Sequence, residues 1–141
     1  MHRFETSVTI AAPPARVWEI LADFERWPTW TASMTRLERL DAGPARVGAR
    51  VRVEQPKLQP TVYTITDWQP GRSFTWTMGG GLLGGRADHE VAPAGAGARL
   101  VLAVTYTGLF GALVAIGYGD LTRRYMAMEA EGLRARAEGR R

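Results

Sequence analysis

The side chain best suited to acid–base chemistry in this sequence is His89. It lies between Asp88 and Glu90 in a segment whose pattern is typical of a β-strand. The two charged neighbours share one face of that strand and are expected to face solvent, so His89 is expected to point inward. An inward histidine can donate a hydrogen bond to a ligand carbonyl or act as a general base near neutral pH. The alternative is a core histidine bonded to a tyrosine or a backbone group.

Tyrosine hydroxyls could assist such chemistry by orienting a ketone or a phenol, while the rings supply apolar contact. The four tyrosines are Tyr63, Tyr106, Tyr118 and Tyr125. For each of them, ordinary core packing is the alternative. The candidate catalytic residues are therefore His89, Tyr118 and Tyr106, and the sequence leaves open whether the chain is an enzyme.

Tyr118 is flanked by glycines in a segment that otherwise reads as a helix. Gly117 and Gly119 join Gly111 there, and each glycine inside a helix costs roughly 1 kcal/mol relative to alanine. A locally weak helix could part from the glycine-rich segment 79–85 to admit a ligand. Close packing of the helix against a sheet would also use glycine, and the two alternatives stay open.

The residue content argues against several other kinds of site. There is no cysteine, which excludes disulfides, thiolate metal sites and thiol nucleophiles. His2 and His89 are the only histidines and have no constellation of ligand type around them, so no metal is expected. The sequence has no GxGxxG, Walker or GxSxG motif, and no cofactor is expected. Carboxylates on the predicted strands fall on solvent faces or turns, so no acid–base pair of carboxylates stands out.

Length and composition predict one globular domain over residues 1–141. Of these 141 residues 45% are hydrophobic and five are tryptophan, which is enough for a substantial core. The net charge of +4 comes from scattered arginines without a recognised motif, so no nucleic-acid partner is expected. The first residues lack the apolar core of a signal peptide, and the apolar stretch 109–118 is too short to span a bilayer. These features predict a cytoplasmic protein without integral membrane association.

The order of patterns predicts one strand and one helix, then six strands, then one long helix. The predicted strands are 6–10, 35–40, 47–54, 61–68, 73–78, 86–91 and 99–106. Tight turns between them favour antiparallel pairing. The last helix is predicted from about Leu109 to Glu138. Its large side chains recur at steps of four and three and form one stripe, which consists of Phe110, Val114, Tyr118, Leu121, Tyr125 and Met128.

A sheet that curls around such a helix cannot contact it everywhere, and this predicts an internal cavity. The order of several motifs also resembles the polyketide cyclase/dehydrase group of the START-like superfamily, which is also called SRPBCC or Bet v 1-like. These motifs are Val8-Thr9-Ile10-Ala11-Ala12-Pro13, Val17-Trp18, Asp23, Trp27-Pro28-Thr29-Trp30, Val47-Gly48, Ile65-Thr66-Asp67-Trp68-Gln69-Pro70, Phe74-Thr75-Trp76, His89-Glu90-Val91 and Gly97-Ala98-Arg99-Leu100. They run through essentially the whole chain.

The resemblance implies an α+β helix-grip fold, in which a seven-stranded antiparallel sheet wraps around the long C-terminal helix and a hydrophobic cavity. It does not fix the function, because the group includes aromatase/cyclases, lipid and sterol carriers, quinone-binding proteins, hydrolases and stress proteins.

The function expected from these observations is the binding of a small hydrophobic ligand, such as a lipid, quinone, polyketide or other aromatic compound, between the sheet and the last helix. The expected ligand-binding residues are Phe74, Trp76, His89, Leu102, Val104, Val114, Tyr118 and Leu121. The alternative is an aromatase/cyclase-type enzyme in which His89 and a cavity tyrosine act as acid and base on a poly-β-ketone. A third class is an interaction protein, either a homodimer or a membrane-surface binder that uses segment 109–116 and the basic tail 134–141.

Overall fold

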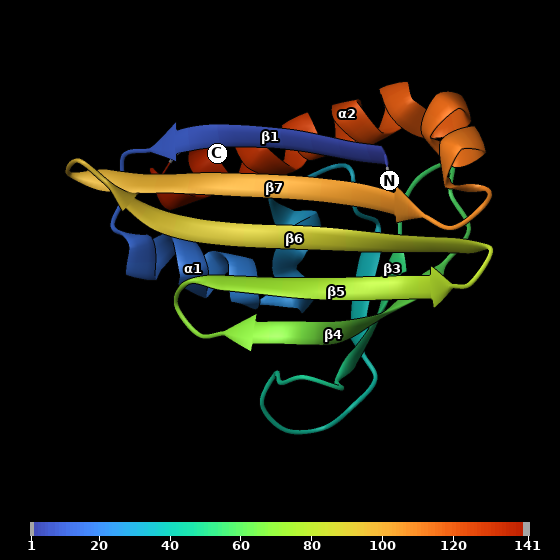
Figure 1. Cartoon of the computed structure of the whole chain (residues 1–141). Coiled ribbons are helices and arrows are strands. Elements are labelled where there is room, and N and C mark those ends of the chain that lie inside the picture. The colour runs from blue at the N-terminus through green and yellow to red at the C-terminus, as the bar shows by residue number, and fades with distance from the viewer. Residues whose placement is uncertain (1, 140–141) are drawn as a thin grey trace.

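Seven strands form one antiparallel sheet that curves around a long helix (Figure 1). The computed structural model describes residues 2–139, so Arg140 and Arg141 of the basic tail lie outside the described residues. The strands pair in the order β1-β7-β6-β5-β4-β3-β2. Their bounds are β1 (His2–Ile10), β2 (Arg36–Arg39), β3 (Arg50–Glu54), β4 (Thr61–Gln69), β5 (Ser73–Gly80), β6 (Leu83–Ala94) and β7 (Gly97–Thr107). This is the helix-grip fold that the sequence resemblance implies.

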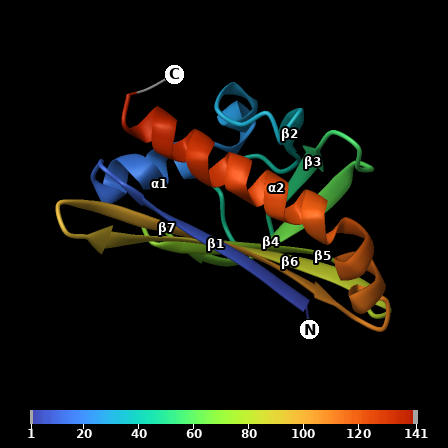
Figure 2. The same cartoon turned by 90° about the horizontal axis from the view of Figure 1, so that it is seen from above.

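Three helices cover one face of this sheet. The long helix α2 (Gly111–Ala137) lies across that face, with the short helix α1 (Pro14–Ala22) near its C-terminal end (Figure 2). A 3-10 helix, η1 (Phe24–Thr29), follows α1 and packs against β2. Pro14 opens α1, where its fixed φ suits the first helical turn and its missing N–H costs nothing. The predicted last helix is confirmed. It begins two residues after the expected start and ends one residue before the expected end.

The face that α2 buries differs from the predicted stripe. The buried residues of α2 are Gly111, Gly119, Thr122, Tyr125, Met126, Ala130, Leu133 and Ala137, so Tyr125 is the buried member of the predicted stripe. The prediction followed the largest side chains, but the helix approaches the sheet most closely where its side chains are small. Of the predicted stripe, Tyr118 is 47% exposed and Met128 faces away from the sheet toward a surface groove.

A cluster of aromatic rings fills the space between the sheet and the α1–η1 region. Phe24 lies with its ring centroid 5.3 Å from that of Phe74 and 5.3 Å from that of Trp76. Trp27 lies 5.5 Å from Trp76 and donates its indole N–H to the Leu21 carbonyl over 2.9 Å. Close aromatic packing of this kind adds to the free energy gained by burial. This half of the molecule is densely packed with aromatic side chains.

The glycine-rich segment between β5 and β6 is mostly paired strand, contrary to the flexible loop expected from its sequence. Gly79 pairs with Gly84, and Gly80 pairs with Leu83. Gly79 has a positive φ of 66°, and a Cβ on this residue would overlap the Leu83 carbonyl oxygen. Glycine is therefore required here by the tight hairpin, because other residues rarely adopt that φ.

Candidate functional site

A cavity of about 360 Å³ lies between the sheet and the first half of α2. It opens to solvent where the exposed residues Gln59, Leu83 and Tyr118 line it. Its lining is mainly apolar and comes from the β3–β4 loop, from strands β4 to β7 and from α2. The members are Gln55, Leu58, Gln59, Thr61, Tyr63, Met78, Leu83, Gly85, Arg86, Ala87, Val104, Tyr106, Val114, Tyr118, Leu121, Thr122, Tyr125, Met126 and Glu129.

A second cavity of about 60 Å³ continues from the first toward the aromatic cluster. Trp27, Trp76, His89 and Leu102 line its inner end. Six residues line both cavities and so mark their junction: Gln55, Tyr63, Ala87, Val104, Met126 and Glu129. A wide cavity with an open mouth thus lies next to a small cavity lined by aromatic residues. We call the zone lined by the six shared residues the junction.

His89 lies at the narrow end, on the inner face of β6, as its alternation with Asp88 and Glu90 predicts. Its ring stacks on Phe74 with centroids 4.1 Å apart and planes 10° apart. Nδ1 lies 3.3 Å from the Phe74 carbonyl oxygen, which can only accept, so Nδ1 carries the proton and Nε2 does not. Burial lowers the pKa of His89 to about 4, and the imidazole is therefore neutral at pH 7.

Glu129 projects from α2 into the junction and was not singled out from the sequence. Burial alone raises the pKa of Glu129 to about 8, because no cation or hydrogen-bond donor of the described residues offsets the loss of solvent. At neutral pH most of this side chain is a neutral carboxylic acid, which can donate a hydrogen bond. The helical phase could have revealed it, since Glu129 lies four residues after Tyr125 and three after Met126.

Tyr63 faces Glu129 from β4 across the junction. Its ring stacks on Trp76 with centroids 5.3 Å apart and planes 29° apart. Burial, followed by the charges of Tyr106 and Glu129, raises the pKa of Tyr63, so the phenol keeps its proton. Its hydroxyl makes no hydrogen bond with any residue between 2 and 139.

The other cavity tyrosines are bonded to the protein. The Tyr106 hydroxyl lies 2.7 Å from Thr122 Oγ1, and that threonine also donates to the Tyr118 carbonyl over 2.8 Å. The Tyr125 hydroxyl donates to the Pro56 carbonyl and so ties α2 to the β3–β4 loop. Tyr118 contributes its half-exposed ring to the mouth.

The structure divides the predicted site residues among three places. Val104, Val114, Tyr118 and Leu121 line the larger cavity, together with the candidate Tyr106. Trp76, His89 and Leu102 line the smaller one, which Val104 also reaches. Phe74 lines neither cavity, because it is fully buried under the His89 ring.

The three glycines in the first half of α2 differ in their surroundings. A Cβ on Gly111 would lie 3.1 Å from the Tyr106 carbonyl oxygen, and one on Gly119 would lie 3.4 Å from the Phe4 ring. A Cβ on Gly117 would meet nothing within 4 Å. Close packing therefore accounts for Gly111 and Gly119, whereas Gly117 weakens the helix at the mouth without a packing reason.

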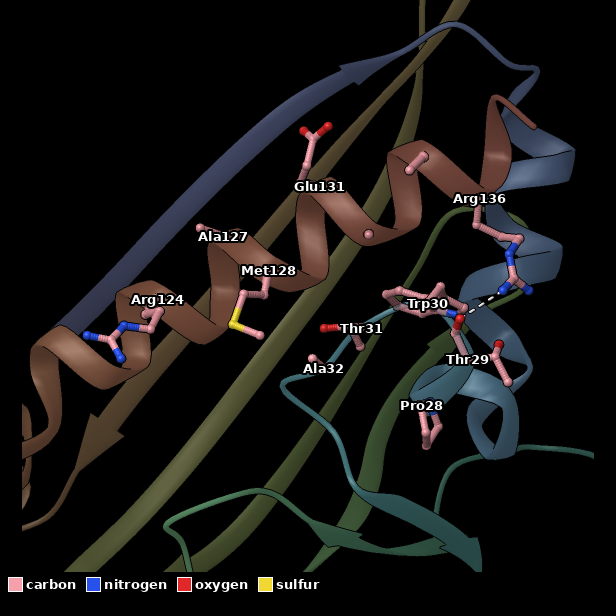
Figure 3. A pocket seen from close by; sticks show the side chains of 12 residues that line it. Pro28, Thr29, Trp30, Thr31, Ala32, Arg124, Ala127, Met128, Glu131 and Arg136 are labelled. Carbon is pink, nitrogen blue, oxygen red and sulfur yellow. Dashed lines mark hydrogen bonds between the residues drawn. The ribbon is translucent and has the colours of Figure 1, made fainter. Parts of the chain in front are cut away.

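A larger groove of about 1110 Å³ lies on the opposite side of α2, against the segment that follows η1 (Figure 3). It is open along its length, and Trp30, Met128 and Gly132 form its floor. Arg136 donates across one end to the Thr29 carbonyl over 2.9 Å. Polar side chains line this groove too, but it is an open surface, so the enclosed junction remains the stronger candidate for chemistry.

Neither a metal centre nor a membrane span is evident in the part of the chain that the structure describes. No group of three or more histidine or carboxylate side chains is placed to hold a metal ion within residues 2–139. In the same range no helix is long and apolar enough to cross a bilayer.

Several solved structures share this fold. TTHA0849 from Thermus thermophilus is 22% identical with a TM-score of 0.76, covering 96% of this chain and 97% of its own. The Zhui aromatase/cyclase from Streptomyces sp. R1128 is 20% identical with a TM-score of 0.75, covering 97% of this chain and 93% of its own. Ara h 8.0201 is 15% identical with a TM-score of 0.74, covering 96% and 97%. At such identities the likeness shows the fold alone.

The family of the chain is assigned from its sequence. No curated protein matches the chain. The sequence model described as "Polyketide cyclase / dehydrase and lipid transport" matches residues 1–138. This match covers nearly the whole length, and the chain belongs to the polyketide cyclase/dehydrase and lipid transport family.

Proposed function

We propose that the protein binds a small hydrophobic ligand, such as a lipid, quinone, polyketide or other aromatic compound, in the cavity between the sheet and α2. The observation that carries this proposal is the cavity of about 360 Å³ with a mainly apolar lining and an open mouth. Its size falls within the range of small-molecule sites, which are typically about 300–1,000 Å³. Membership of a family described by lipid transport supports the same function.

The surface around the mouth supports a route for an apolar ligand. Leu82, Leu109, Leu113 and Ile116 are exposed large hydrophobic residues on the β5–β6 turn and at the start of α2. Apolar side chains that gather on a surface commonly mark a binding site. Gly117 lies beside them in α2, and its helix-weakening effect would ease opening at this point.

The test is binding of a fluorescent fatty acid to the purified protein, followed by displacement with unlabelled apolar compounds. Leu121→Trp should fill the larger cavity and weaken binding at least about tenfold, since Leu121 lines it. Val47→Trp is the control, because Val47 is 60% exposed in the β2–β3 loop and does not line the cavity. Absence of binding by the wild-type protein, or equal losses in the two variants, would refute the proposal.

A second candidate function is acid–base catalysis of the aromatase/cyclase type. One observation favours it: His89, Tyr63 and Glu129 line the same small cavity. Neutral His89 has an unprotonated Nε2 that could take a proton from an activated carbon, although its lowered pKa makes it a weak base. Catalysis would also require the narrow end to widen, because about 60 Å³ does not hold a polyketide chain.

Hydrogen–deuterium exchange at the methyl group of 2-acetonaphthone provides the test of this second candidate. An enzyme of this type should speed the exchange above the buffer rate, and His89→Gln should abolish the gain. Exchange at the buffer rate with bound ketone would leave binding as the function and remove catalysis by His89.

A further inference from the structure

The junction brings together polar groups whose hydrogen-bonding capacity the protein leaves unused. Glu129 and Tyr63 both line the two cavities where these meet. Within residues 2–139 neither the carboxyl nor the phenol has a hydrogen-bond partner. Gln55, the third polar member, donates to the Ser33 carbonyl over 3.3 Å. Both side chains are half-buried and line a cavity that opens to solvent, so their free hydrogen-bonding groups are available to the polar atom of a ligand that enters it.

The protonation states of Glu129 and Tyr63 define which kind of ligand atom would bind to them. Burial raises the pKa of Glu129 to about 8 and also raises the pKa of Tyr63, so both groups carry a proton at neutral pH. A carboxylic acid kept neutral by an apolar site can donate a hydrogen bond together with a tyrosine. Both groups can donate to an acceptor oxygen of the ligand, and while Glu129 is neutral they offer no negative charge to pair with an ammonium group.

The charged groups near the junction do not change this conclusion. On β6, Arg86 donates to the Asp88 carboxylate over 3.2 Å, and His89 is neutral. Tyr106 on β7, and Tyr118 and Tyr125 on α2, are the other titratable groups that line the cavities. Strand β1 places Arg3 and Glu5 in a pair with each other, and Arg16 of α1 donates to carbonyls at the far end of α2.

We propose that Glu129 and Tyr63 act as a pair of hydrogen-bond donors that binds a carbonyl oxygen of the ligand at the junction. This inference rests on the proposed function and narrows it, because it selects ketones, quinones and other carbonyl compounds from the apolar ligands that could fill the cavity. The ligand's rings would occupy the larger cavity, with the oxygen directed toward the narrow end. Glu129 and Tyr63 are binding residues in this proposal and take no part in bond making or breaking.

Three probes with one carbon frame test the proposal by calorimetric titration. They are 2-acetonaphthone, which carries the carbonyl, 2-isopropylnaphthalene, which replaces it with an apolar group, and 1-(2-naphthyl)ethylamine, which carries a cation. The ketone should bind about tenfold more tightly than the hydrocarbon at pH 7, which corresponds to about 1.4 kcal/mol. This preference should decrease as the pH rises through about 8, because the Glu129 carboxylate no longer donates and only Tyr63 remains as a donor.

Two variants separate the effect of the hydrogen-bond donors from the effect of Glu129 ionisation. Glu129→Gln keeps an N–H donor, so it should keep the preference for the ketone and lose its pH dependence. Tyr63→Phe should reduce the preference several-fold while the hydrocarbon binds as before. The isotope-labelled carbonyl of the bound ketone should also absorb at a lower wavenumber than in hexane, and less so in Tyr63→Phe.

The outcomes distinguish this inference from the proposed function. Equal binding of ketone and hydrocarbon to the wild-type protein would overturn the donor pair and leave the apolar cavity function standing. Strongest binding of the amine, increasing toward pH 8, would overturn it in favour of a carboxylate that binds cations. If none of the three probes binds although the fluorescent fatty acid does, the donor pair is overturned and the cavity function stands; if the fatty acid does not bind either, both fail. The wild-type pH series decides the matter even if a variant does not fold.

Discussion

The two ends of the space between the sheet and α2 contrast in packing although one helix and one sheet build both. At the α1–η1 end, aromatic rings fill the interior, and α2 approaches through Gly132, Leu133 and Ala137. At the other end α2 holds Val114, Tyr118 and Leu121 away from the sheet, and a cavity remains. We call these the packed end and the open end. We expect from this contrast that the packed end contributes most of the stability and that the fold can therefore tolerate a cavity at the open end.

The largest expected effect comes from truncating an aromatic ring at the packed end. Phe74→Ala should lower the free energy of unfolding by about 3–5 kcal/mol, because Phe74 is fully buried and the cavity left behind adds to the lost burial. Tyr118→Ala removes a ring of similar size at the open end, where Tyr118 is 47% exposed, and should cost less than about 1 kcal/mol. Urea denaturation followed by circular dichroism measures both. Similar losses in the two variants would show that the ends are not energetically distinct.

The two ends should also respond to pH in opposite directions. Burial lowers the pKa of His89 from 6.5 to about 4, so the unfolded chain binds its proton more tightly and stability falls as the pH drops through this range. Burial raises the pKa of Glu129 from 4.5 to about 8, so the folded chain binds that proton more tightly and stability falls as the pH rises toward 8.

Of these two groups, only the ionisation of Glu129 changes the stability between pH 6.5 and 8. Below pH 4.5, only the protonation of His89 changes it. Denaturant midpoints measured across pH 4 to 9 should therefore decline at the alkaline side in the wild-type protein but not in Glu129→Gln. His89→Gln should flatten the acid side alone. A decline above pH 6.5 that persists unchanged in Glu129→Gln would contradict the assignment.

A pair of glycine substitutions should change stability in opposite senses. A Cβ on Gly132 would overlap the Trp30 carbonyl oxygen, so Gly132→Ala should force η1 away from α2 and cost about 1–3 kcal/mol. A Cβ on Gly117 meets open space, so Gly117→Ala should stabilise the helix by about 0.5–1 kcal/mol. Thermal unfolding measures both signs. A destabilised Gly117→Ala protein would mean that the open end needs this glycine for its folded state.

The smallest expected effect concerns a hydrogen bond that joins the sheet to α2 at the open end. Tyr106→Phe removes the 2.7 Å contact with Thr122 and should cost about 0.5–1.5 kcal/mol. A double-mutant cycle with Thr122→Val isolates the pairwise contribution. A coupling energy near zero would assign the stability of the open end to apolar contacts alone.

Sequence patterns predicted the architecture well, because the alternation of side chains in the strands and the periodicity of the final helix are local signals. Packing in the sheet did not change the secondary structure that these signals favour. The hairpin at Gly79–Gly84 was less predictable, since glycine signals freedom of the backbone but not whether a partner strand is present. The face of α2 could not be read from side-chain size, because the small residues Ala130 and Gly132 permit the close approach.

The candidate site was predictable only in part. The inward orientation of His89 followed from its charged neighbours, yet its separation from the larger cavity depends on Trp27 and Trp76, which are distant in sequence. Glu129 was missed because a carboxylate on a helix ordinarily faces water. Its burial depends on β4 and the β3–β4 loop, whose positions no helical pattern contains.

Tryptophans lie at the packed end and tyrosines at the open end, and this distribution gives the protein an intrinsic fluorescence probe of its cavity. The indoles of Trp18, Trp27, Trp30, Trp68 and Trp76 lie in contact with one another or with Phe74 at the packed end. All four phenols line the open end. Energy absorbed by the tyrosines is thus transferred toward tryptophan along the axis of the cavity, with stacked Tyr63 and Trp76 in direct contact. A ligand in the cavity would change the surroundings of the tyrosine rings and of Trp76, so the emission of the unlabelled chain should report occupancy.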